Sequence, residues 1–255
     1  MRILKLFILF SIVLLGCITE EPQNLITPPA QNLTLNPLKD NVTKVVEVKS
    51  KTGRVWMDRN LGASQVASSP KDEKAYGDLY QWGRGADGHQ LRTSGVTLVI
   101  PSSEVPGHSD FIIPITNSFQ WLTSSMGRLW QGVDGINNPC PKGFRIPTRE
   151  EWSLEKASWD ITNGKEGTDA IGAFNSPLKL TVAGQRLYEP KDRSARLNAV
   201  GAFGIYVSST IEPQIYNVYH YVISFHIYTP GSSGEFAKIG QGNYAYGQSC
   251  RCIKE

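Results

Sequence analysis

Residues 137–152 read Asn-Asn-Pro-Cys-Pro-Lys-Gly-Phe-Arg-Ile-Pro-Thr-Arg-Glu-Glu-Trp, and this stretch decides the fold of the chain. Gly143–Ile146 is predicted to be a short strand that enters from Cys140. Pro147 ends that strand, because proline has no backbone N–H to donate to a sheet and cannot continue into a helix interior. The stretch therefore predicts a strand and a helix separated by a single proline.

The helix is expected to begin just after Thr148. The Thr148 hydroxyl can accept from the backbone N–H of Glu151, and the Glu151 side chain can reach back, which is the pattern of a capping box. Helical spacing then puts Trp152 and Trp159 on one face, two turns apart. Two tryptophans on one face predict a helix that packs against a core.

Short strands are predicted on both sides of this stretch. Val45–Met57 has apolar residues in two short runs around a Thr52-Gly53 turn, which predicts a hairpin. Further strands are predicted at 96–100, 178–182, 201–209 and 219–228. In the last of these, alternation puts the odd-numbered residues on the core and the even-numbered ones, His220 and His226 among them, on a solvated face. These two histidines would be roughly 20 Å apart, too far to share a metal ion.

Tyr76, Tyr80 and Trp82 form a dense aromatic group interleaved with glycines. Two interpretations stay open. Aromatic residues beside glycines often pack in the core of loop-rich domains, and the same rings could instead be ligand contacts on which a sugar stacks. A base-stacking surface is not expected, because no stripe of Lys and Arg accompanies the rings.

Composition and charge exclude several classes of function. The 255 residues carry a formal net charge of +3, with 26 Lys and Arg against 23 Asp and Glu, so no nucleic-acid partner is predicted. Two loop histidines, His89 and His108, do not make the set of three or four ligands that a metal ion needs. The sequence has no Ser-His-Asp order, paired-carboxylate motif or zinc signature. We therefore predict no catalytic residue, no metal and no cofactor.

The N-terminal 16 residues predict a lipoprotein signal peptide. Arg2 and Lys5 precede an apolar run of about ten residues, which is too short for a comfortable membrane span. The run ends in Leu14-Leu15-Gly16-Cys17, which resembles the bacterial lipobox. Lipidation is therefore predicted at Cys17, and the alternative is an uncleaved anchor that happens to carry a cysteine.

Residues 17–44 predict a flexible tether, since Pro, Gln, Asn and Thr dominate and no periodicity is sustained. Residues 45–255 are then expected to form a single domain. The protein would be lipid-anchored on a bacterial membrane, at the outer membrane or the cell surface.

Three cysteines remain in the predicted domain: Cys140, Cys250 and Cys252. An odd number in an oxidising compartment predicts one disulfide and one leftover thiol. Cys250 and Cys252 would face opposite ways on a strand, so only one of them can point at Cys140.

Several motifs together resemble the Fibrobacter succinogenes major paralogous domain family, and they occur in the family order over roughly residues 45 to 255. In chain order they are VWMDRNLGA at 55–63, YGDLYQWG at 76–83, NPCPKGFRIPT at 138–148 with EW at 151–152, LKL at 178–180 with AG at 183–184, GIYVSST at 204–210 and GQSCRCI at 247–253.

The resemblance implies an α+β fold that is similar to C-type-lectin-like domains of the formylglycine-generating-enzyme type. Such a fold has short twisted antiparallel strands, one or two helices and long loops. The family usually has an apolar residue at the position of Cys250, which implies a disulfide between Cys140 and Cys252 and a free thiol at Cys250. It usually has tryptophan at the position of Val207, so no aromatic ligand contact is expected there.

These features predict a lipid-anchored cell-envelope protein that acts as a non-enzymatic binding or structural module. Its expected partners are the membrane, through Cys17, and a glycan or another cell-envelope protein. The alternative is an enzyme related to the formylglycine-generating oxidases, which use two closely spaced cysteines, but the spacing of Cys250 and Cys252 is too short for that pair. A calcium-dependent sugar site is not expected, because the loop motifs of true C-type lectins are missing.

Overall fold

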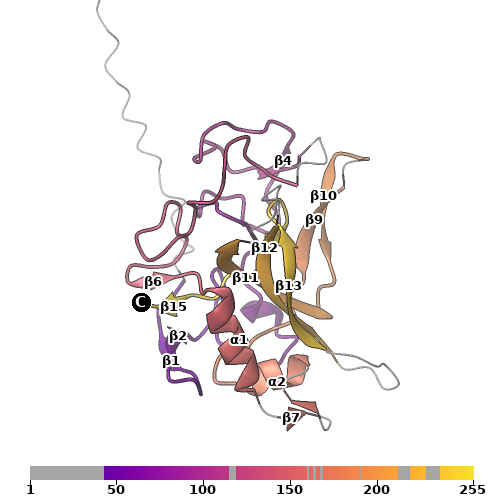
Figure 1. Ribbon diagram of the computed structural model, residues 1–255. Coiled ribbons are helices and arrows are strands. Elements are labelled where there is room, and N and C mark those ends of the chain that lie inside the picture. The colour runs from indigo at the N-terminus through magenta and orange to yellow at the C-terminus, as the bar shows by residue number, and fades with distance from the viewer. Residues whose placement is uncertain are drawn as a thin grey trace, which may run out of the picture. The chain divides into compact units, whose positions relative to one another are not determined.

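The computed structural model describes residues 43–114, 119–159, 161–162, 165–166, 169–189, 191–211, 219–227 and 236–255. The predicted signal peptide, Cys17 and nearly all of the predicted tether lie outside this part of the chain. Figure 1 shows short strands, two α-helices and long connections. Among the described residues, no helix has the length and apolar character needed to cross a membrane.

The first sheet joins the predicted hairpin to residues from the middle and the end of the chain. Its strand order is β1 (Glu47–Lys49), β2 (Val55–Met57), β15 (Ile253–Lys254) and β6 (Phe144–Arg145). In the turn between β1 and β2, a glycine at φ +86° donates its N–H to the Ser50 carbonyl, so the predicted hairpin is confirmed. β15 lies between this hairpin and β6, which fixes the stretch 137–152 to the C-terminal strand.

Two larger sheets follow. A four-stranded sheet has the order β10 (Ser194–Asn198), β9 (Gln185–Glu189), β14 (Gly247–Gln248) and β3 (Tyr80–Gln81). A three-stranded antiparallel sheet, called the β11–β13 sheet below, has the order β11 (Phe203–Ile211), β12 (Tyr219–His226) and β13 (Ala237–Asn243). The strands predicted at 201–209 and 219–228 are therefore present, with slightly different bounds.

The remaining elements are short. β4 (Val96–Thr97) pairs in parallel with β5 (Phe111–Ile112), and β7 (Ile161–Thr162) pairs antiparallel with β8 (Lys165–Glu166). A single turn of 3-10 helix, η1, covers Glu73–Ala75. The strand predicted at 96–100 is thus present only as its first two residues.

Helix α1 (Arg149–Ala157) begins where the sequence predicts. The backbone N–H of Glu151 donates to the Thr148 hydroxyl at 3.2 Å, and the Thr148 N–H donates to the Glu151 carboxylate at 2.9 Å, so the capping box is complete. Helix α2 (Ala170–Asn175) is capped by the carboxylate of Asp169. Both helices contact β12 and cover one face of the β11–β13 sheet (Figure 1).

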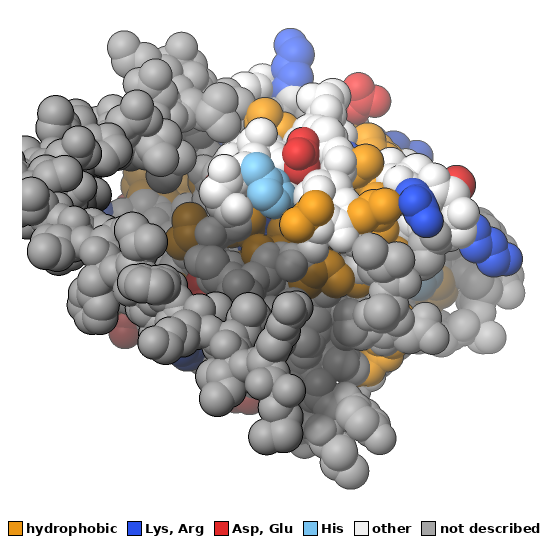
Figure 2. All heavy atoms as spheres, turned by 90° about the horizontal axis from the view of Figure 1, so that it is seen from above, with side chains coloured by type: hydrophobic (Ala, Val, Ile, Leu, Met, Phe, Trp, Pro, Cys, Tyr) orange, Lys and Arg blue, Asp and Glu red, His pale blue; other side chains and the backbone are white. Residues whose placement is uncertain are grey.

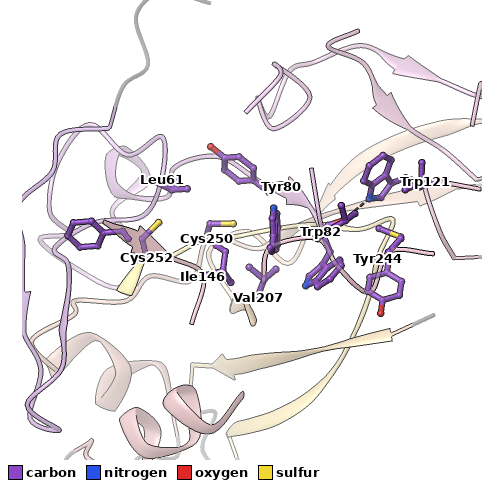
Figure 3. Close-up of a cluster of buried hydrophobic side chains, with 14 of the residues drawn as sticks. Leu61, Tyr80, Trp82, Trp121, Ile146, Val207, Tyr244, Cys250 and Cys252 are labelled. Atoms are coloured by element: carbon purple, nitrogen blue, oxygen red, sulfur yellow. Dashed lines mark hydrogen bonds between the residues drawn. The ribbon is translucent and has the colours of Figure 1, made fainter. Parts of the chain in front are cut away.

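The core contains two main clusters of buried side chains. Trp152 and Trp159 lie in one of them, beneath the helices, together with Tyr206, Ile223 and Phe225 of the β11–β13 sheet. The second cluster surrounds Trp82, whose carbonyl accepts a hydrogen bond from Trp121 Nε1 at 2.6 Å (Figure 3). Trp152 and Trp159 therefore share a buried face, as the helical spacing predicts.

The described part of the chain consists mostly of antiparallel strands in small sheets, with two α-helices. This arrangement is consistent with a mainly β or an α+β fold. The described residues from 43 to 255 belong to one compact unit by their contacts.

The predicted strand at 178–182 is wrong. Leu178, Leu180 and Val182 are fully buried, but their segment pairs with no strand. The backbone N–H of Thr181 donates to the Tyr206 hydroxyl and that of Val182 donates to a loop carbonyl, each at 2.9 Å. Alternating apolar residues mark burial here, and side-chain and loop acceptors take the place of a sheet ladder.

The predicted solvent exposure of His220 on β12 is wrong, although the direction of its side chain is as expected. Ile223 and Phe225 face the helix-covered cluster as expected, but His220, on the opposite face, has no exposed surface. Its ring stacks on Trp82 and Tyr244, with centroids 5.8 and 5.5 Å apart. Alternation predicts a solvated second face only where nothing covers it, and here the Trp82 cluster covers one end of that face.

Candidate ligand-binding groove

A groove with a volume of about 360 Å³ lies on the face of the β11–β13 sheet that the helices leave uncovered. Phe203 and Ile205 of β11, Val222 and Ser224 of β12, and Lys238 of β13 line it from the sheet. The neighbouring β9–β10 hairpin supplies Gln185 and Asn198 from the side. The volume falls within the range of pockets that hold small organic ligands.

Two glycines explain why this face of the sheet is hollow. Gly240 and Gly242 line the groove from β13, at alternate positions on the same face as Lys238. A Cβ atom added to Gly240 would meet no atom within 4 Å, whereas one added to Gly242 would lie 2.6 Å from a methyl group of Val222. Gly240 therefore leaves open space, and Gly242 lets β13 pack closely on β12.

Amide side chains supply most of the polar lining. Gln185, Asn198 and Gln248 come from three different strands, and each side chain carries an NH2 group that donates and a carbonyl oxygen that accepts. The side chains of Asn198 and Ser224 make no hydrogen bond within the part of the chain that the structure describes. These two groups are therefore free to bind a ligand.

The side-chain amide of Gln248 is held in one orientation by its contacts with His220 and Gln185. His220 Nε2 donates to Gln248 Oε1 at 2.8 Å, and Gln248 Nε2 lies 3.5 Å from Gln185 Oε1. Burial lowers the pKa of His220 to about 3, although the hydrogen bond to Gln248 opposes that shift, so the ring is neutral at pH 7. Within the described residues this neutral ring hydrogen-bonds to Gln248 alone, and so it fixes that amide without adding charge to the groove.

Aromatic rings lie at the edge of the groove. Phe203 keeps 39% of its surface exposed and packs on His226, with ring centroids 4.9 Å apart. Tyr246 lines the groove and packs on Tyr188 at 5.5 Å. Burial raises the pKa of Tyr246, so its hydroxyl is neutral at pH 7 and can donate as well as accept. The edge thus combines apolar ring surface with a polar tip.

The aromatic residues predicted from the sequence lie elsewhere. Tyr76, Tyr80 and Trp82 are buried, with 5%, 4% and 0% of their surface exposed. Trp82 Nε1 donates to the Ser208 carbonyl at 2.8 Å, and Arg92 lies over the Tyr76 ring. Of the two interpretations, core packing describes all three, since rings without an exposed face offer no stacking surface.

The cysteines also lie away from the groove. Cys140 and Cys252 form a disulfide, with Cα atoms 5.9 Å apart, and Cys250 is a buried free thiol. Burial and, to a smaller extent, the charge of Asp78 raise the pKa of the Cys250 thiol well above its usual value. A protonated thiol with no exposed surface is a poor nucleophile.

The described residues contain no group of three His, Cys, Asp or Glu side chains placed to hold a metal ion. His89 has both ring nitrogens engaged, since Nδ1 lies 2.6 Å from an Asp87 carboxylate oxygen and Nε2 accepts from the Gln81 N–H at 3.0 Å. His108 Nδ1 accepts from the Asp110 N–H. On the face seen in Figure 2, basic and acidic side chains are scattered among neutral and hydrophobic ones.

The groove is not predictable from a local sequence pattern, because its residues come from separate strands between 185 and 248. One local signal was present. Two glycines at alternate positions, 240 and 242, interrupt an otherwise regular strand, and such glycines often mark a close approach of another group. Comparisons with known proteins add no assignment, because no family model, no curated protein and no solved structure matches the chain.

Proposed function

We propose that this protein is a lipid-anchored module of the bacterial cell envelope that binds a saccharide in the groove of the β11–β13 sheet. The observation that carries the proposal is the chemistry of the lining. Amides from three strands, a free serine hydroxyl and two edge aromatic rings surround one space of about 360 Å³.

A saccharide matches this lining group by group. Each sugar hydroxyl both donates and accepts, and so does the amide of Asn198, beside which Gln185 Nε2 adds donors. The C–H face of a sugar ring is apolar and packs on an aromatic ring, a role that fits Phe203 and Tyr246. A purely apolar ligand would cover the Asn198 amide without giving it a partner, which costs about 1–3 kcal/mol for a buried group.

The fold and the family belong to the same proposal. We infer a C-type-lectin-like α+β domain of the Fibrobacter succinogenes major paralogous type from six motifs in the family order. The central motif supplies β6 and the capping box of α1, and the last motif supplies β14 and β15. The small antiparallel sheets and two helices of the described chain agree with this inference at the level of fold class.

The anchor is proposed from the sequence pattern around Cys17. Cells that express the full chain are grown with a radiolabelled fatty acid, and the label is expected on the protein and in the membrane fraction. Cys17→Ala should abolish both, since stable anchoring depends on the acyl chains. Equal labelling of the variant would reject lipidation at Cys17.

An oxidase related to the formylglycine-generating enzymes remains the alternative. Such chemistry needs two cysteines that reach the substrate. Cys252 is bonded to Cys140, and Cys250 is buried among the residues around Trp82. The binding role is therefore preferred.

Saccharide binding is tested by screening the full chain in detergent on an array of plant, bacterial and host glycans. The affinity for each saccharide that binds is then measured by calorimetry. The unchanged protein is compared with two variants that each add an indole ring. Gly240→Trp places an indole in the open space of the groove and is expected to abolish binding. Leu154→Trp adds it on an exposed position of α1 and is expected to leave binding unchanged.

Thermal unfolding of both variants shows whether they fold. A folded Gly240→Trp variant that binds as well as the unchanged protein would overturn the groove as the site. An array on which no saccharide binds would overturn the proposed function.

A further inference from the structure

We propose that the saccharide carries an anionic group, a carboxylate or a sulfate, that pairs with the ammonium group of Lys238. This inference rests on the proposed function and names the class of sugar that the groove takes. Lys238 is the one charged residue among the described residues that line the groove. No acidic side chain stands beside it there to neutralise its charge.

The position of Lys238 suits this role. It lies on β13 directly opposite Ser224 of β12, in register, on the face that forms the floor of the groove. The side chain is exposed and makes no ion pair within the described part of the chain. An ammonium group has three donors and no acceptor, so the partner that it favours is an anionic oxygen.

The titratable groups near Lys238, His226 and Asp169, are not among the residues that line the groove. His226 is diagonal to Lys238 on the same sheet, and its pKa is lowered by burial and by the charge of Lys238. Asp169 is the acidic group that acts on His226, but it is the N-cap residue of α2 and is not among the residues that line the groove. Lys238 is therefore the charged side chain that a ligand in the described part of the groove would meet.

The charged and the neutral polar groups of the groove come from different strands, so they can bind different parts of one sugar. Lys238 lies on the edge strand β13, whereas Gln185 and Asn198 belong to the β9–β10 hairpin. That hairpin begins beside β11, because the Gly184 N–H donates to the Phe203 carbonyl at 2.8 Å. A bound sugar would place its anionic group toward β13 and its hydroxyls toward these amides. Because Lys238 is exposed, solvent weakens the pair, and the expected gain in affinity is about three- to tenfold.

The test uses the full chain and three matched saccharide sets: uronic-acid oligosaccharides, the same oligosaccharides with their carboxyl groups reduced to alcohols, and sulfated oligosaccharides. Acidic forms are expected to bind about three- to tenfold more tightly than the reduced forms. Lys238→Met should weaken the binding of the acidic forms more than that of the reduced forms and so remove the preference, and Lys238→Arg should retain it. The preference should shrink as salt is raised from 50 to 500 mM. The sulfated set shows whether carboxylate or sulfate is the better anion.

Several outcomes separate this inference from the proposed function. Equal binding of acidic and reduced forms, or a preference that survives in Lys238→Met, overturns the inference and leaves saccharide binding intact. Absence of binding by every set overturns the proposed function and the inference with it. Gly240→Trp should abolish binding of both forms alike, which shows that the anion preference acts inside the groove.

Discussion

His220 of β12 and Gly242 of β13 face each other in register so closely that the glycine cannot carry a side chain. A Cβ atom at residue 242 would lie 2.7 Å from His220 Nε2 and 2.6 Å from Val222 Cγ1. Gly242→Ala is therefore expected to destabilise the protein by about 1–3 kcal/mol, the usual cost of overpacking. Chemical denaturation of the variant measures this change.

Gly240→Ala is the matched control, because it lies two residues away on the same face and meets no atom within 4 Å. Its effect is expected to stay within about 0.5 kcal/mol. Similar losses for the two alanine variants would show that general strand propensity, and not contact with His220, governs position 242.

The buried ring of His220 predicts a loss of stability in acid. Its pKa is about 3 in the folded protein, against 6.5 in the unfolded chain, because burial disfavours the charged ring. Between these pH values the unfolded state binds more protons, so this contribution is complete above pH 6.5 and is lost as the pH falls toward 3. The loss is on the order of 3 kcal/mol at pH 4.

His220→Phe should flatten this part of the pH profile. Phenylalanine can keep the stacking on Trp82 and Tyr244, but it leaves Gln248 Oε1 without its donor and so costs about 1 kcal/mol at pH 7. The free energy of unfolding of both proteins is measured from pH 7 to 4. Parallel profiles would contradict the assignment of the acid loss to His220.

Thiol counting tests the cysteine arrangement. In a Cys17→Ser variant, denatured without reductant, one reactive thiol from Cys250 is expected, because Cys140 and Cys252 are bonded. Reduction should then lower stability by about 2–5 kcal/mol, since the bond closes a loop across a separation of 112 residues. The double variant Cys140→Ser and Cys252→Ser should show the same loss and no response to reductant. Three reactive thiols would refute the disulfide.

The elements that could be predicted from the sequence are those whose hydrogen-bond partners lie within a few residues of each other in the chain. The capping box of α1 and the turn at Gly53 are set by residues within a few positions of each other, and both are confirmed. The segment 178–182 has the same local alternation as a strand, but its N–H groups donate to a tyrosine hydroxyl, to loop carbonyls and to groups of the nearby α2 end. A single sequence does not show which distant groups will accept those bonds.

The candidate site was less predictable for the same reason. Tyr76, Tyr80 and Trp82 stand out in the sequence because they lie close together in the chain. All three are buried in the core and do not form the site. The groove combines residues from six strands, β9 to β14, and its hollow depends on side chains that are absent at Gly240 and Gly242. His220 was assigned to solvent because the ring stack that covers it comes from residues 82 and 244.

The carboxyl group of Asp78 gives a prediction of opposite sign to that of His220. It is 8% exposed, makes no hydrogen bond within the described residues, and has a pKa raised to about 6 by burial, which the charge of Arg92 partly offsets. Between pH 3.8 and 6 the folded state binds more protons, so stability from this group falls as the pH rises through that window. Asp78→Asn should therefore stabilise the protein at pH 7, by up to about 3 kcal/mol, and have little effect at pH 4.

Asp72→Asn supplies the contrast, because hydrogen bonds from the Ser68 N–H and other nearby groups lower the pKa of Asp72. That substitution should destabilise the protein at pH 7, with a loss that is present above the ordinary value of 3.8 and shrinks as the pH falls below it. Denaturation curves from pH 4 to 7 distinguish the two aspartates, because the effect of Asp78→Asn changes strongly over this range. A destabilised Asp78→Asn variant at pH 7 would mean that the carboxylate is a structural acceptor, and burial would no longer explain its raised pKa.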